Sequence, residues 1–98
     1  MTRPQLNDRT VVMGDVYPRF GIVPIHMISL PDNHVGMDMA QMEYYVSLLR
    51  AGETLAPVLI LQDGDRCWLI DGRHRFLAHI IAGKAEIGAL VSTSLKLV

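Results

Sequence analysis

The 98-residue sequence has a single cysteine, Cys67, which excludes an intrachain disulfide and a cysteine-rich metal site. Charged residues make up only 19% of the chain and the formal net charge is −1, so a basic surface for nucleic acid could only be a local patch. No apolar run approaches the roughly 18 residues of a membrane span. The start, MTRPQLNDRT, lacks the apolar core of a secretory signal. We therefore expect a cytoplasmic protein without a membrane partner.

Half of the residues are hydrophobic, which is enough for the core of one domain of this length. Residues 1–21 are mostly polar and rich in turn-forming residues, so we assign them to an N-terminal segment and loop, with one short strand at 10–13. Residues 22–92 carry the regular apolar patterns and form the predicted domain. Residues 93–98 are assigned to a C-terminal tail.

Apolar periodicity predicts the secondary structure of this domain. The predicted order is strand 22–30, helix 37–51, hairpin strands 57–61 and 66–70, helix 73–82 and strand 87–91. Asp38 is placed to cap the first helix and Gly52 to end it. The apolar stripe of this helix is expected to face the core and consists of Met39, Met42, Val46 and Leu49. The order predicts a small α/β (α+β) domain, a mixed sheet with two main helices.

Residues 70–84, IDGRHRFLAHIIAGK, place three potentially cationic side chains directly after a glycine, where a strand passes into a helix. The first turn of a helix has N–H groups without intrahelical partners and a partial positive charge, and phosphate is a typical ligand there. Cations at this end disfavour the helix by roughly 0.3–1 kcal/mol each. Residues that break a local rule of this kind concentrate at functional sites. The pattern therefore suggests an anion site.

A purely structural explanation of the same residues is also open. Asp71 could cap the helix or pair with an arginine. The arginines of the segment could form surface salt bridges with Asp63, Asp65 or Glu86. The residues by themselves do not decide between this arrangement and the anion site.

From Val23 to Val91 the sequence resembles the ParB/sulfiredoxin-like domain, also described as the ParB-like nuclease domain family. Four pieces carry the resemblance: VPIHMISL, the helix at 39–52, LAPVLI, and LIDGRHRFLA followed by AGKAEIGALV. The last piece resembles the family's box in which a glycine precedes basic residues that open a helix. In the family this box holds nucleotide phosphates.

The resemblance implies a role for each matching residue. The phosphate ligands would be Gly72, Arg73, His74 and Arg75. Arg75 is the strongest candidate, because a guanidinium can grip two phosphate oxygens at once. The remaining implied roles are a base or sugar contact at Leu55 and Pro57, catalysis at His74 and Asp32, and a metal contact at Asp71. The implied cofactor is CTP or ATP, and the resemblance also allows Mg²⁺, DNA and a second copy of the chain as partners.

Departures from the family pattern narrow the expected chemistry. Sulfiredoxins need a cysteine inside the box, where this chain has Arg73, and the kinases carry a glutamate after the first strand, where the nearest acid is Asp32. The sequence ends at Val98, soon after the last strand, so we expect no helix-turn-helix region. We expect phosphate binding with NTP hydrolysis or nuclease activity. The alternative is a non-enzymatic nucleotide- or DNA-binding partition module, and a small-molecule kinase ranks third.

Overall fold

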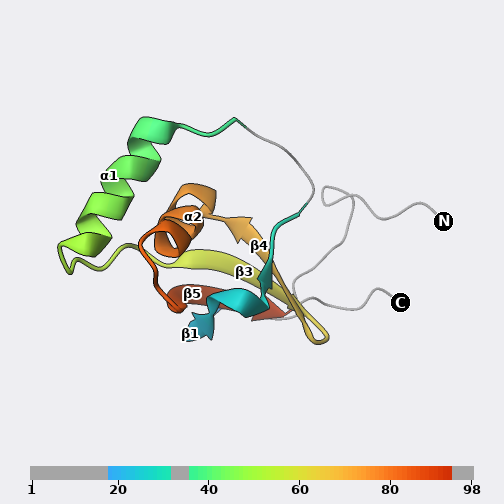
Figure 1. The fold of residues 1–98 in the computed structure, drawn as a ribbon. Coiled ribbons are helices and arrows are strands. Elements are labelled where there is room, and N and C mark those ends of the chain that lie inside the picture. The colour runs from blue at the N-terminus through green and yellow to red at the C-terminus, as the bar shows by residue number, and fades with distance from the viewer. Residues whose placement is uncertain (1–17, 32–35, 94–98) are drawn as a thin grey trace.

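The computed structural model describes residues 18–31 and 36–93, which form a mixed five-stranded sheet and two α-helices (Figure 1). This arrangement confirms the predicted α+β fold class. In chain order the elements are β1 (Arg19–Pro24), the 3-10 turn η1 (Ile25–Met27), β2 (Ile28–Ser29), α1 (Met39–Arg50), β3 (Val58–Asp63), β4 (Arg66–Asp71), α2 (Arg73–Ile81) and β5 (Glu86–Thr93).

The strands lie in the order β1-β5-β3-β4-β2. The hairpin of β3 and β4 is antiparallel, as predicted, and turns at Gly64, whose φ of 65° is in the left-handed region. Strand β5 runs parallel to β3 and antiparallel to β1, while β2 runs parallel to β4. The two ends of the predicted strand 22–30 therefore lie on opposite edges of the sheet.

The prediction of one continuous strand at 22–30 is wrong. Pro24 has no N–H to donate to a sheet ladder, and β1 ends there. The chain then forms η1, with the Ile25 N–H donating to the carbonyl of Ala85 at 2.9 Å, and β2 begins at Ile28. Strand β1 also starts at Arg19, inside the segment predicted as loop, because residues 19–24 pair with β5.

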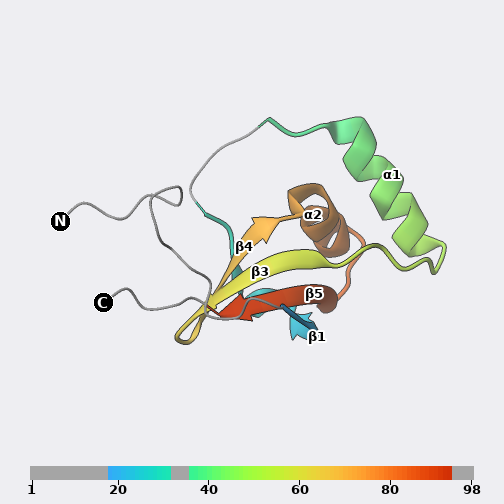
Figure 2. The same cartoon turned by 180° about the vertical axis from the view of Figure 1, so that it is seen from behind.

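Helix α2 lies over one face of the sheet, and α1 packs beside α2 on the side away from the sheet (Figures 1 and 2). One core cluster lies between the sheet and α2 and includes Val58, Ile60 and Phe76. The second lies between the two helices and is formed by Met42, Val46, Leu49 and Ala78. Among the elements that the structure describes, α1 therefore makes its main contacts with α2.

Both predicted helices are confirmed, with their ends shifted by at most two residues. The Asp38 carboxylate caps α1 by accepting the Gln41 N–H at 3.1 Å, and Gly52 follows the helix with a φ of 88°. Three members of the predicted stripe are buried, but the fourth, Met39, is 55% exposed. Neither helix in residues 18–31 and 36–93 has the length and hydrophobicity that a bilayer crossing needs. The strand predicted at 10–13 lies outside these residues.

Candidate functional site

The site begins where β4 passes into α2. Gly72 is the N-cap residue of α2 and has a φ of 104°, a conformation that side-chain-bearing residues rarely adopt. A Cβ at this position would lie 2.6 Å from Cγ1 of Val58, so only glycine lets the helix start so close to β3. Asp71 does not cap the helix, because α2 has no side-chain cap. Packing alone therefore already requires the glycine.

The first turn of α2 opens onto a cavity of about 340 Å³. This volume lies within the range of small-molecule sites, roughly 300–1,000 Å³. The cavity is lined by residues from the end of β4, the start of α2, α1 and the residues before it: Pro31, Gly36, Gln41, Tyr45, Leu69, Ile70, Asp71, Gly72, Arg73, His74 and Arg75. All four predicted phosphate ligands thus border one space. The first main-chain donor with an intrahelical partner is Phe76, which bonds to Gly72 at 2.8 Å.

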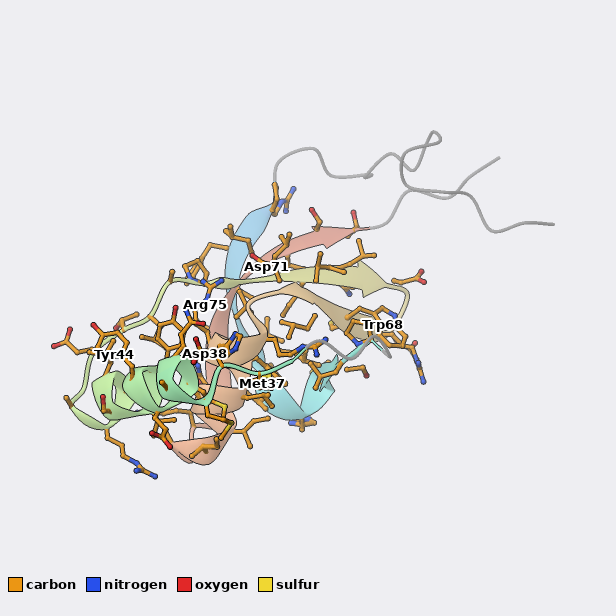
Figure 3. The ribbon with its side chains drawn as sticks, turned by 90° about the horizontal axis from the view of Figure 1, so that it is seen from above. Met37, Asp38, Tyr44, Trp68, Asp71 and Arg75 are labelled. Carbon is orange, nitrogen blue, oxygen red and sulfur yellow. The ribbon has the colours of Figure 1, made fainter. Side chains whose placement is uncertain are left out.

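Arg75 is held by contacts within the protein. Its Nη1 donates to the carbonyls of Ala56 at 3.1 Å and Pro57 at 2.8 Å, which belong to the segment that leads into β3. Its Nη2 lies 3.9 Å from a carboxylate oxygen of Asp71, whose side chain is 78% exposed, compared with 20% for Arg75. Figure 3 labels Arg75 of α2, Asp71 at the end of β4, and Asp38, the N-cap residue of α1. Arg75 therefore joins α2 to the segment before β3. Its Nη1 makes both hydrogen bonds, whereas Nη2 makes only the longer contact with Asp71.

His74 connects the starts of the two helices. The backbone N–H of Asp38 donates to His74 Nε2 at 2.9 Å, across 36 residues of sequence. A neutral imidazole has one donor and one acceptor nitrogen, so this bond leaves the ring proton on Nδ1. The contact brings the N-terminus of α1 to that of α2, and both helices border the cavity. A further histidine of α2, His79, is buried and bonds through Nδ1 to the carbonyl of Arg75 at 2.7 Å.

The residues predicted near a base or sugar do not line this cavity. Leu55 packs against the cluster between the helices, and the carbonyl of Pro57 is taken by Arg75. The structure instead brings Gln41 and Tyr45 of α1 to the cavity. Sequence reasoning missed both. The available signal was their four-residue spacing, which places both side chains on one side of the helix.

Two further predictions concern catalysis and metal binding. Asp32 and its neighbour His34 lie outside the described residues, so the predicted catalytic role of Asp32 stays a prediction. Within residues 18–31 and 36–93, no three His, Cys, Asp or Glu side chains gather into a group that could hold a metal ion. Asp71, predicted as a metal contact, borders the cavity and pairs with Arg75. Cys67 is buried in β4.

No protein-family model matches this sequence, and no curated protein sequence matches it. Solved structures do match its fold. Sulfiredoxin from Arabidopsis thaliana is 19% identical, with a TM-score of 0.64 over 76% of this chain and 84% of that one. The chromosome-partitioning protein ParB from Caulobacter crescentus, truncated at its C-terminus and complexed with CTP-γ-S, is 16% identical with a TM-score of 0.61 over 74% of this chain.

A free serine kinase in complex with AMP is 15% identical, with a TM-score of 0.60 over 85% of this chain. The chain spans 43% of the ParB structure and 34% of the kinase structure. Identities at this level show the fold alone. The resemblance stated from the sequence is confirmed at that level: the chain has the ParB/sulfiredoxin-like fold.

Proposed function

We propose that the chain binds a nucleotide, CTP or ATP, through its phosphates in the cavity at the start of α2. The observation that carries the proposal is that Gly72, the first turn of α2 and three cationic or potentially cationic side chains border the same open space. The N–H groups of that turn have no partner inside the helix and carry its partial positive charge. This combination favours a phosphate group over a neutral ligand.

The solved structures of the same fold support the choice of ligand. The ParB structure from Caulobacter crescentus is complexed with CTP-γ-S, and the free serine kinase structures are in complex with ADP or AMP. Proteins of one fold can differ in chemistry, so the neighbours favour a nucleotide without specifying its base or its reaction.

The contacts within the protein suggest which part of the nucleotide each site residue binds. Arg73 and the N–H groups of the first turn are proposed to grip the phosphates. Arg75 would contribute through Nη2, because its Nη1 already serves two carbonyls. Gln41 and Tyr45, which face the cavity from α1, are proposed to contact the sugar or base in place of Leu55 and Pro57. An amide and a phenol offer the donors and acceptors that such contacts need.

A second candidate is a nucleotide-binding module without turnover, and the engagement of His74 favours it. His74 Nε2 already accepts the Asp38 N–H at 2.9 Å, so this nitrogen is not available as a general base while the two helix starts are joined. In such a module, bound nucleotide would stabilise the junction of the two helices. NTP hydrolysis, nuclease activity and DNA binding remain predictions of the family resemblance.

Thermal shift with CTP, ATP, ADP and GTP, each with and without Mg²⁺, tests the proposal. A ligand at 100 times its dissociation constant stabilises the native state by about 2.7 kcal/mol, which raises the melting temperature of a domain of this size by roughly 10–20 °C. Inorganic phosphate release in the same samples then separates hydrolysis from binding alone. No shift with any of the four nucleotides would overturn the proposal.

Two variants test the placement of the ligand. Arg73→Ala removes a cation at the cavity and should weaken binding at least tenfold, about 1.4 kcal/mol. Arg66→Ala is the matched control, because Arg66 lies in β4 over the ring of Trp68 and outside the cavity. Equal loss of affinity in both variants would mean that the nucleotide is attracted by overall charge and not by this site.

A further inference from the structure

A groove that the nucleotide site does not use runs along one side of α1, where this helix packs against α2. It has a volume of about 540 Å³ and is lined by Met39, Met42, Glu43, Val46, Ser47, Arg50 and, from α2, Ile81. The six α1 residues recur at three- and four-residue spacing along the whole helix, so they form one straight stripe. Gln41 and Tyr45, which border the cavity, project from the opposite side of α1.

The groove has an apolar floor and exposed apolar walls. Met42 and Val46 are buried and form the floor. Met39 and Ile81 are 55% and 49% exposed and form the walls. Large apolar side chains gathered on one open surface are typical of a protein–protein contact. Methionine is also adaptable in shape, which suits it to such contacts.

The stripe carries one charge of each sign. Glu43 is in the second turn of α1 and Arg50 is the last residue of the helix, about 10 Å further along its axis at 1.5 Å per residue. That separation is too long for an ion pair between them. When two copies of such a helix meet antiparallel across a two-fold axis, each glutamate faces the arginine of the other copy. The charges of this helix are thus complementary to those of the same helix in a second copy.

We propose that a second copy of this chain docks in the groove, with the two α1 helices antiparallel and the two-fold axis passing between Val46 and Ser47. That position is midway between Glu43 and Arg50, so the two-fold axis creates two identical pairs, each between Glu43 of one copy and Arg50 of the other. Ser47 is small enough to let the helices approach closely. Its hydroxyl already donates to the carbonyl of Tyr44 at 2.8 Å, so burial leaves no unpaired donor.

The size of the contact determines the expected affinity. With the axis between Val46 and Ser47, residues 43–50 of the two α1 helices overlap over about 12 Å, so the interface is at the small end of known interfaces, below roughly 1,200 Å². We therefore expect a reversible dimer with a dissociation constant of the order of micromolar to hundreds of micromolar. The dimer does not depend on the proposed nucleotide site, because the two surfaces are on opposite sides of α1.

Sedimentation velocity of the full chain from about 10 µM to 1 mM, at low and high salt, tests this arrangement. Glu43→Arg and Arg50→Glu each replace two attractive contacts by two repulsive ones and should weaken the dimer about tenfold or more. The double variant Glu43→Arg/Arg50→Glu restores both pairs and should return the dissociation constant to within about threefold of the original. Asp65→Arg and Arg66→Glu make the same charge changes at the β3–β4 hairpin and should have no such effect.

A chain that stays monomeric at about 1 mM would overturn the proposal. So would a dimer that is insensitive to both single variants, or a double variant as weak as the singles. Folding of each variant is checked by circular dichroism. A restored dimer in the double variant also shows that the single variants failed through charge and not through misfolding.

Discussion

Replacement of Arg75 by alanine should destabilise the fold whether or not a nucleotide binds. The guanidinium donates to two carbonyls, of Ala56 and Pro57, and its side chain is largely shielded from solvent. A hydrogen bond from a charged group contributes about 1.5–3 kcal/mol, and the contact with Ala56 is exposed, so we take about 3 kcal/mol for both. The ion pair with exposed Asp71 adds less than about 1 kcal/mol.

A loss of about 3 kcal/mol corresponds to a fall in melting temperature of roughly 12–24 °C for a domain of this size. The assay is thermal unfolding followed by circular dichroism, without nucleotide. Arg66→Ala is the control, since an exposed cation–π contact with Trp68 at 5.2 Å is worth about 0.5–1 kcal/mol. A fall of less than about 4 °C for Arg75→Ala would refute the structural role of this arginine.

Two other substitutions test the local geometry of the site, and urea denaturation measures both. Gly72→Ala should lower the free energy of unfolding by about 2–4 kcal/mol, because it combines a strained φ of 104° with a Cβ only 2.6 Å from Val58 Cγ1. A loss below about 1 kcal/mol would show that the start of α2 is not packed this way. Asp38→Ala removes the cap of α1 and should cost about 1 kcal/mol, whereas Asp38→Asn should retain most of the stability; equal losses in the two variants would contradict the capping role.

The parts of the fold that were predicted correctly depend on neighbours in the sequence. The apolar spacing in each helix, the cap at Asp38 and the β3–β4 hairpin are set by residues within a few positions of one another. The strand predicted at 22–30 failed because its two halves join opposite edges of the sheet. Which edge a strand joins is decided by pairing with distant segments, and a local pattern does not contain that information.

The candidate site was also predicted only in part, because its local features were recognisable and its long-range contacts were not. The glycine and the basic turn were recognisable because strand, glycine and helix start follow one another in sequence. The hydrogen bonds of Arg75 were not recognisable, because the carbonyls that accept them belong to residues 18 and 19 positions away. Gln41 and Tyr45 were missed for a related reason. Their place at the cavity depends on how α1 packs beside α2, which their spacing along the helix does not reveal.

The central claim is that nucleotide phosphates bind at the first turn of α2, and the most direct measurement is a titration of ¹⁵N-labelled protein with CTP, and then with ATP, by NMR. The binding account predicts the largest amide shifts at residues 72–75, with smaller ones at Gln41 and Tyr45. Backbone N–H groups that contact a phosphate report it without any mutation. Amide shifts that stay unchanged up to a few millimolar nucleotide, or that are largest in residues 52–56 on another cavity, would contradict it.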